Sequence, residues 1–309
     1  MPRPESPPGT DDLVVAHAAA TWGQLVAAGT ALLREAGVER PAVDARRIVE
    51  EASGCDGAEL AAALDQHPAT DRNRRSWAAM VLRRTGGEPL QYVLGRWAFR
   101  HLDLFVDQRV LIPRPETEQV VEVAIREGRA LGDHLTWVDL GTGSGAIALS
   151  IAREVDDATV WATDVSAGAI SVARANLAAL GRRAQRVRIV EGSWYEALPS
   201  ELVGAVDVVV SNPPYVRAGD PLPPVVAEWE PMSALRAGDD GLSDIDEIVA
   251  GAAIWLRPGG VIVMEHAPDQ GHDVRHRAEA VGLVDAATRA DLAGRARMLV
   301  ARRSTNMVP

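Results

Sequence analysis

The apolar positions of the first hundred residues recur at helical spacing. Thr21 stands three positions before Gln24, as in a capping box, and apolar residues then follow three or four positions apart. Pro41 and Thr70 stand where a first turn and an N-cap would begin two further helices. The pattern predicts helices at 21–37, 41–53, 58–64 and 70–85. Together they predict a small helical bundle over residues 21–85.

The first twenty residues lack this spacing. Residues 1–9 contain four prolines and no apolar run, which is typical of a segment that cannot bury a core. The segment also lacks the apolar stretch of a signal peptide. We therefore predict a disordered, proline-rich tail over residues 1–20.

Between residues 91 and 112 the period changes from helical to alternating. Apolar and polar side chains alternate from Tyr92 to Val106, and a period of two predicts paired strands. We expect a β-hairpin within a linker that covers residues 86–114. A proline followed by acidic residues then predicts a helix from Pro115 to Leu131.

From Leu135 onward, short apolar segments alternate with amphipathic ones. The apolar segments lie at 135–140, 158–163, 186–191, 206–211, 259–265, 282–288 and 296–302. The amphipathic segments lie at 144–153, 166–180, 243–256 and 269–281. Buried strands separated by helices of this length predict a doubly wound α/β domain with a mostly parallel sheet. We assign residues 115–304 to this domain.

The composition of the 309-residue chain limits its classes of function. Its net charge of −11 argues against a nucleic-acid backbone as the main partner. Five arginines lie between residues 72 and 84, either as a solvated helix face or as a docking surface for an acidic partner. The only cysteine is Cys55, so we expect a reducing compartment. No apolar run reaches the ~18 residues of a spanning helix, and we expect a cytoplasmic protein that contacts no membrane.

A glycine-rich turn follows the first strand of the α/β domain. Asp139 and Leu140 lead into the sequence Gly141-Thr142-Gly143-Ser144-Gly145, after which a helix begins. Glycines there let the backbone turn sharply and approach a ligand closely. Asp164 ends the next strand, where its carboxylate can accept hydrogen bonds from both ribose hydroxyls of a nucleoside cofactor.

The glycine spacing alone fits two cofactors. It also matches the Gly-x-Gly-x-x-Ala fingerprint of dinucleotide sites, so NAD and S-adenosylmethionine remain alternatives. Asp139 favours S-adenosylmethionine, which carries an ammonium group and no phosphate, because a carboxylate sits poorly beside a pyrophosphate. Trp194, just past the third strand, either stacks on the cofactor's adenine or belongs to the core.

The sequence Asn212-Pro213-Pro214-Tyr215 follows a run of buried strand residues. Two prolines cannot continue a strand, because they lack the N–H that a ladder needs. The chain therefore leaves the sheet as a rigid loop, in which the Asn212 side-chain oxygen and the Pro213 carbonyl can both act as acceptors. Two such acceptors suit a planar –NH2 group, as in an amide or the exocyclic amine of a base. A plain strand-ending turn is the alternative.

These segments resemble the HemK/PrmC family of protein-(glutamine-N5) methyltransferases, which modify peptide chain release factors. Residues 87–95 resemble the family's interdomain segment, and residues 111–118 contain its Pro-Arg-Pro-Glu-Thr block. The glycine turn, the acid, the tryptophan and the Asn-Pro-Pro-Tyr loop follow in the family's order. Residues 230–242 resemble the segment that comes after that loop, so the resemblance covers roughly residues 21–302.

The resemblance implies a Rossmann-like class I S-adenosylmethionine-dependent methyltransferase, with a seven-stranded sheet that has one antiparallel strand, an N-terminal helical bundle and a β-hairpin linker. It implies cofactor binding, with S-adenosylhomocysteine as product, by Asp139, Gly141, Thr142, Gly143, Ser144, Gly145, Asp164, Trp194 and Asn212. It implies substrate binding by Asn212, Pro213, Pro214 and Tyr215, with Asn212, Pro213 and Tyr215 as the catalytic residues.

The implied substrate is a glutamine in the Gly-Gly-Gln loop of a release factor, which the bundle at 21–85 would help to recognise. We expect a monomer that binds no nucleic acid directly and no metal. The spacing of His266, His272 and His276 matches no zinc pattern that supports a metal site.

The chain departs from the family pattern in two places. Glu265-His266-Ala267 stands where family members tend to read Glu-Ile-Gly, and Gly294-Arg295-Ala296-Arg297 lacks the acid often found there. Both segments lie away in the sequence from the predicted cofactor and substrate residues. They leave the reaction type intact and bear on the identity of the substrate.

Three other functions remain open at this stage. The Asn-Pro-Pro-Tyr loop is shared with adenine-N6 and small-molecule amine methyltransferases. A catalytically inactive, cofactor-binding adaptor would keep the same fold, although Asn212 and Asp164 are both present. A dehydrogenase would bind NAD at the glycine turn. The balance of motifs favours a protein-glutamine methyltransferase.

Overall fold

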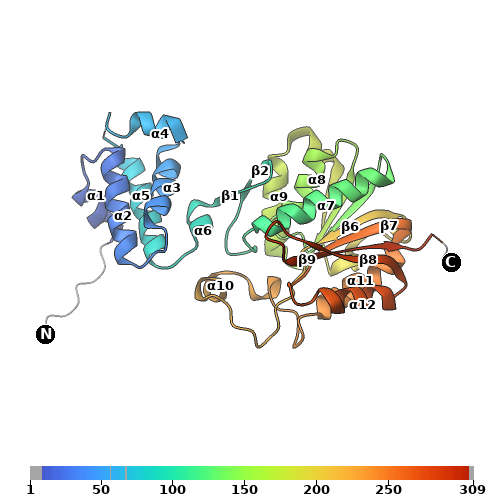
Figure 1. The fold of residues 1–309 in the computed structure, drawn as a ribbon. Coiled ribbons are helices and arrows are strands. Elements are labelled where there is room, and N and C mark those ends of the chain that lie inside the picture. The colour runs from blue at the N-terminus through green and yellow to red at the C-terminus, as the bar shows by residue number, and fades with distance from the viewer. Residues whose placement is uncertain (1–8, 56, 67, 306–309) are drawn as a thin grey trace. The chain divides into compact units, whose positions relative to one another are not determined.

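The computed structural model describes residues 9–55, 57–66 and 68–305. The chain divides into two compact units, Met1–Gly95 and Arg96–Pro309 (Figure 1). The first unit is built of helices: α1 (Thr10–Ala16), α2 (Trp22–Glu35), α3 (Pro41–Ser53), α4 (Gly57–Ala63), α5 (Asp71–Thr85) and α6 (Leu90–Leu94).

The predicted bundle helices are confirmed. At the start of α2, Thr21 Oγ1 accepts a hydrogen bond from Gln24 N–H at 3.3 Å, and Gln24 Oε1 accepts one from Thr21 N–H at 2.9 Å. This is the reciprocal capping box that the sequence predicts. The apolar faces meet in a core in which Leu25, Ile48 and Trp77 have no exposed surface.

The predicted tail over residues 1–20 is wrong for residues 10–20, because α1 forms there. Leu13 and Val14 are each only 5% exposed and belong to the bundle core. The Asp12 carboxylate accepts the N–H of Gly9 at 2.9 Å and so starts the helix. The prolines end before this point, and two apolar residues suffice to dock one short helix. Residues 1–8 of the predicted tail lie outside the described residues.

Most arginines of α5 form ion pairs within the first unit. The pairs join Arg74 and Arg75 to Asp71, Arg75 to Asp11, Arg83 to Glu88, and Arg84 to Asp44. Their charge is compensated locally, which leaves little of it for an acidic partner. The structure therefore favours the salt-bridged helix face over the basic docking surface.

The predicted hairpin forms, but over a shorter range than expected. β1 (Arg96–Phe99) and β2 (Leu102–Phe105) pair in antiparallel register around a two-residue turn. Residues 91–94, expected as strand, lie in α6 instead, which ends at Gly95 in the left-handed conformation with φ 70°. Three consecutive apolar residues fit one turn of a buried helix as well as a strand, and the period does not separate the two.

The second unit contains a seven-stranded sheet, as predicted. Its strands are β3 (Thr136–Leu140), β4 (Thr159–Asp164), β5 (Val187–Glu191), β6 (Val206–Ser211), β7 (Leu256–Glu265), β8 (Leu283–Ala290) and β9 (Ala296–Arg303). Their spatial order is β5-β4-β3-β6-β7-β9-β8, and β9 alone runs antiparallel to the other six strands. The order reverses between β3 and β6, where doubly wound sheets bind ligands at the carboxyl ends of the strands.

Helices cover both faces of this sheet. They are α7 (Pro115–Leu131), α8 (Ala146–Glu154), α9 (Ala167–Ala178), α11 (Ser243–Trp255) and α12 (Gly271–Ala280). The short helix α10 (Pro224–Trp229) lies in the segment between β6 and α11. Figure 1 shows α7, α8 and α9 on one face, and α11 and α12 on the other. Trp137 of β3 packs directly against Gly128 of α7, where a Cβ would lie 2.2 Å from the indole. The sequence pattern did not predict α10.

No helix among the described residues is both long enough and apolar enough to cross a membrane.

Candidate active site

A cavity of about 320 Å³ opens at the carboxyl edge of the sheet in the second unit. The loops after β3, β4, β5 and β6 meet there, together with the start of α7 and of α11. Its wall includes Arg109, Thr117, Gly141, Thr142, Gly143, Ser144, Asp164, Trp194, Asn212, Pro214, Asp244 and Glu247.

The side chain of Asp164 is hydrogen-bonded to the backbone of the glycine turn. Gly143 N–H donates to Asp164 Oδ2 at 2.8 Å, and Ser166 N–H donates to Asp164 Oδ1 at 2.9 Å. Burial raises the pKa of Asp164, while the two N–H groups act in the opposite direction. Each carboxylate oxygen keeps a lone pair for a further donor, and the residue lies on the cavity wall.

Asp139 lies beneath the glycine turn and not on the cavity wall. The side chain has no exposed surface, and its Oδ2 accepts from Thr142 Oγ1 at 2.6 Å and from Ala148 N–H at 3.1 Å. Burial raises the pKa of this carboxyl to about 7. Asp139 therefore holds the turn to the start of α8, and its expected engagement of an ammonium group, directly or through water, stays a prediction.

Trp194 lies across the glycine turn and also packs against the core of the second unit, so its stacking on a cofactor base stays a prediction. A Cβ on Gly141 would lie 3.1 Å from the indole, and Gly141 itself has φ 72°. Trp194 also has a positive φ of 38°, which a residue with a large side chain rarely adopts. Backbone strain of this kind is concentrated at binding sites.

The Asn212 loop, residues 212–215, follows β6, and hydrogen bonds of Tyr215 hold its C-terminal end. Tyr215 N–H donates to Leu235 O at 3.2 Å, and Gln270 Nε2 donates to Tyr215 O at 3.0 Å and to Gly241 O at 3.1 Å. Asn212 and Pro214 lie on the cavity wall, whereas Pro213 is buried. Neither Pro213 nor Tyr215 contributes to the wall among the described residues.

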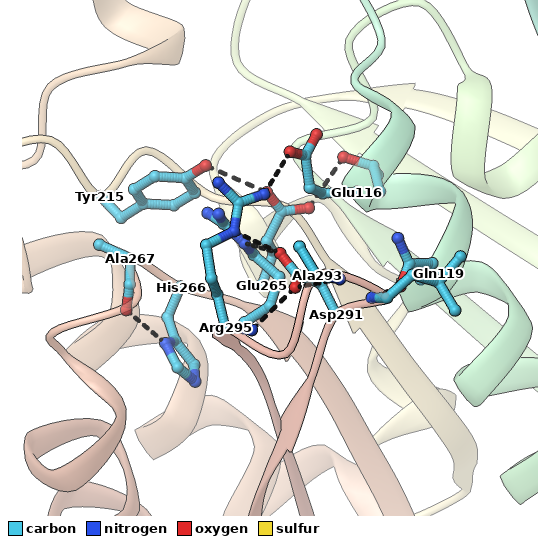
Figure 2. Close-up of polar contacts among 12 residues, drawn as sticks. Glu116, Gln119, Tyr215, Glu265, His266, Ala267, Asp291, Ala293 and Arg295 are labelled. Carbon is cyan, nitrogen blue, oxygen red and sulfur yellow. Dashed lines mark hydrogen bonds and ion pairs between the residues drawn. The ribbon is translucent and has the colours of Figure 1, made fainter.

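Behind the loop, side chains from three elements form a hydrogen-bonded chain. Asn212 Nδ2 donates to Thr117 Oγ1 at 3.1 Å, and Thr117 Oγ1 donates to Glu265 Oε2 at 2.8 Å. The Tyr215 hydroxyl donates to Glu265 Oε1 at 3.0 Å, and Figure 2 shows these two groups facing each other. Burial raises the pKa of Glu265, and burial together with Glu265 raises that of Tyr215.

The two departures from the family pattern lie next to this chain, contrary to the expectation from sequence distance. His266 is fully buried, its Nδ1 lies 2.7 Å from Ala267 O, and burial lowers its pKa. Arg295 pairs with Asp291 at 2.9 Å and with Glu116 at 3.0 Å (Figure 2). His266 directly follows Glu265 in the chain, and Arg295 pairs with the residue next to Thr117.

Sequence reasoning missed several residues that shape the site. Thr117 and Glu265 lie in segments that the family resemblance quoted without a role. Glu230 is 6% exposed and accepts from Ile112 N–H at 3.1 Å while pairing with Arg114. The sequence indicated these three residues only by their place in segments that resemble the family: Thr117 lies in the Pro-Arg-Pro-Glu-Thr block, and Glu230 and Glu265 lie in segments after the loop.

Asp244 and Glu247 of α11 also went unnoticed, and they add two carboxylates to the cavity wall. Among the residues that the structure describes, no group of three or more His, Cys, Asp or Glu side chains is placed to hold a metal ion.

The fold and the site define a class of protein. A sheet of this order, with a glycine turn after β3 and an Asn-Pro-Pro-Tyr loop after β6, is that of a class I methyltransferase. The crystal structure of the hMettl16 catalytic domain in complex with MAT2A 3′UTR hairpin 1 is similar, with a TM-score of 0.51 and 16% identity. The likeness covers 76% of this chain and 83% of that one, and it concerns the fold alone.

Sequence comparison then gives the family. Residues 24–95 match the family model of the PrmC N-terminal domain, and residues 129–228 match that of the methyltransferase small domain. The chain is 43% identical over 273 residues to the release factor glutamine methyltransferase of Xylella fastidiosa (strain 9a5c), covering 88% of this chain and 97% of that protein.

A second relative, the release factor glutamine methyltransferase of Streptomyces coelicolor, is 40% identical over 283 residues, covering 90% of this chain and 97% of that protein. The chain belongs to the release factor glutamine methyltransferase family, and it is a methyltransferase.

Proposed function

We propose that this enzyme transfers a methyl group from S-adenosylmethionine to the side-chain amide nitrogen (N5) of a glutamine in the Gly-Gly-Gln loop of a peptide chain release factor. The observation that carries the proposal is the orientation of Asn212. Its Nδ2 donates to Thr117, so its Oδ1 is the atom left to accept from a substrate amide at the cavity wall. The names of the curated relatives support the same reaction.

The wall of the cavity suits S-adenosylmethionine better than NAD. It carries the carboxylates of Asp164, Asp244 and Glu247, and its one arginine, Arg109, is already paired with Asp107 at 2.5 Å. An acidic wall favours a cofactor that bears a sulfonium and an ammonium group, and it disfavours a pyrophosphate. Asp164 would accept from the ribose hydroxyls, and Trp194 would stack on the adenine.

When bound, S-adenosylmethionine supplies an electrophilic methyl group. An amide nitrogen is a poor nucleophile, because its lone pair is delocalised into the carbonyl. Asn212 Oδ1 and the Pro213 carbonyl would accept the two N–H groups of the substrate amide and aim the nitrogen along the line of transfer. Positive charge that develops on the nitrogen strengthens both hydrogen bonds, so the transition state gains more than the ground state.

Tyr215 is not placed to act as a base in this reaction. Its hydroxyl donates to the buried Glu265, and its pKa is raised well above its usual range. No strong base is required, since an N-methylated, protonated amide loses its proton readily. We assign Tyr215 to holding the loop in place, and Pro214 to the wall of the substrate site.

The remaining assignments follow from the same reaction. We propose that residues 21–85 recognise the release factor, that residues 86–114 link them to the catalytic domain at 115–304, and that a monomer acts in the cytoplasm, where translation terminates. Neither a nucleic acid nor a membrane is required as a partner.

Transfer assays with labelled cofactor test the proposal. The enzyme is incubated separately with a release factor, with adenine-containing DNA and RNA, and with small amines. We expect label in the release factor alone, together with calorimetric binding of S-adenosylmethionine and none of NAD. Label in nucleic acid would favour the adenine-N6 alternative, cofactor binding without any transfer would favour an adaptor, and binding of NAD would favour a dehydrogenase.

A further inference from the structure

The side-chain amide of Asn212 has two ends of opposite hydrogen-bonding character, and only one orientation serves the proposed reaction. With Oδ1 toward the substrate, the residue accepts from an –NH2 group. With Nδ2 toward the substrate, it would present a second donor to that group. Something in the protein must therefore select one orientation.

The hydrogen-bonded chain behind the loop makes this selection. Glu265 is 1% exposed, and as a carboxylate it only accepts hydrogen bonds. Thr117 has a single hydroxyl hydrogen, which it donates to Glu265 Oε2 at 2.8 Å. Its oxygen can then only accept from Asn212, and the group 3.1 Å away is Nδ2.

We infer that Thr117 and Glu265 are positioning residues for methyl transfer, which fix the Asn212 amide with Oδ1 toward the methyl acceptor. This inference rests on the proposed function. Thr117 is only 3% exposed, so water has little access to replace either partner. The second carboxylate oxygen of Glu265 is held by Tyr215, which fixes the other end of the same loop.

The surroundings of Glu265 stabilise this arrangement from a second side. Burial raises the pKa of Glu265, while the hydrogen bonds from Thr117 and Tyr215 and the charge of Arg297 of β9, which is 8% exposed, act in the opposite direction. Arg297 itself lies 3.7 Å from Asp291, which also holds Arg295 (Figure 2). The segment in which this chain departs from its family thus supports the carboxylate that orients Asn212.

Two variants of Thr117 separate a hydroxyl effect from a packing effect. Thr117→Val keeps the shape but removes the hydroxyl, whereas Thr117→Ser keeps the hydroxyl. In single-turnover transfer with saturating cofactor, we expect Thr117→Val to lower the rate about 10- to 100-fold, the size of effect that a small misplacement produces. Thr117→Ser should stay near the wild-type rate, and both should bind the cofactor as wild type does. Equal rates for the Val and Ser variants would overturn the inference.

A spectroscopic readout is independent of transfer. The chain has four asparagines, Asn73, Asn176, Asn212 and Asn306, so protein labelled with ¹⁵N only at asparagine gives four pairs of side-chain amide signals. The pair that disappears in Asn212→Asp belongs to Asn212. We expect Thr117→Val and Glu265→Gln to shift this pair and to leave that of Asn176 in place.

An unchanged Asn212 signal in the folded Glu265→Gln protein would overturn the inference even if Thr117→Val did not fold.

Different results would contradict the proposed function and the orienting role of Thr117 and Glu265. A wild-type enzyme that does not methylate the release factor, yet shows the expected Asn212 shifts, would contradict the proposed substrate and leave the orienting role of Thr117 and Glu265 standing.

Discussion

The two sides of the cavity hold their functional groups by different means. On the cofactor side, Asp164 is held by the backbone N–H groups of Gly143 and Ser166, at 2.8 and 2.9 Å. On the Asn212 side, the groups are held by other side chains, and Thr117 and Glu265 come from α7 and β7. Only substitution by proline removes a backbone N–H, whereas many single substitutions remove a side-chain partner.

The difference predicts that cofactor binding and methyl transfer respond to separate sets of substitutions. On the cofactor side, the affinity for S-adenosylmethionine should fall when the carboxylate of Asp164 itself is removed. On the Asn212 side, substitution of Thr117 or Glu265 should lower the rate of methyl transfer without lowering the affinity for the cofactor.

The largest effect is expected at Asn212. We expect Asn212→Ala to lower the single-turnover rate by about 10²–10³ or more, because it removes a preorganised acceptor for charge that develops on the substrate nitrogen. Cofactor affinity should stay nearly unchanged. Asn212→Asp keeps an acceptor oxygen and should retain partial activity. A wild-type rate for Asn212→Ala would show that the loop is only a structural turn.

Asp164 provides the matching test on the cofactor side. We expect Asp164→Ala to weaken S-adenosylmethionine binding by about 1.5–3 kcal/mol, measured by calorimetry, because a charge-assisted acceptor for the ribose hydroxyls is lost. The rate at saturating cofactor should fall much less than in Asn212→Ala. Unchanged affinity would remove Asp164 from the cofactor site.

Removal of the first unit separates recognition from chemistry. The residues from 96 onward form a compact unit that contains the whole cavity. We expect this fragment to bind S-adenosylmethionine but to methylate the intact release factor with a kcat/KM reduced about tenfold or more. Full activity of the fragment on the whole factor would contradict a recognition role for the bundle.

A further test concerns stability, at Asp139. Its folded-state pKa is raised to about 7, above the value of about 4 for an unfolded chain. The folded state therefore holds a proton that the unfolded state has lost between these values, and the free energy of unfolding should fall as pH rises from 4 to 7. Urea unfolding of Asp139→Asn, which cannot ionise, should show a weaker fall over that window. Parallel curves for the two proteins would contradict the role of Asp139.

The same contrast explains what could be predicted from the sequence. The glycine turn, Asp164 and the Asn212 loop lie directly at strand ends, so local patterns place them at one edge of the sheet. The contacts of Thr117 span 95 and 148 residues and depend on the order of β3, β6 and β7 and on where α7 packs. Hydrophobic periodicity gives the elements but not their neighbours.

Local patterns also failed where a short segment satisfies two periods. The apolar residues of α6 fit a strand equally well, and α1 needs only Leu13 and Val14 to dock on the bundle. Asp139 was expected to engage the cofactor directly or through water, and the sequence did not show that its side chain lies buried under the turn, where it accepts from Ala148 N–H. The alternation of side chains along β3 predicts the burial of Asp139 only when the position of α8 over that strand is also known.

The position of the transferred methyl group tests the central claim most directly. A release factor is incubated with the enzyme and S-adenosylmethionine, digested, and the modified residue is located by tandem mass spectrometry. The account predicts one methyl group on the side-chain amide of the glutamine in the Gly-Gly-Gln loop with the wild-type enzyme, and almost none with Asn212→Ala. A methyl group on another residue type, or equal modification by both enzymes, would contradict it.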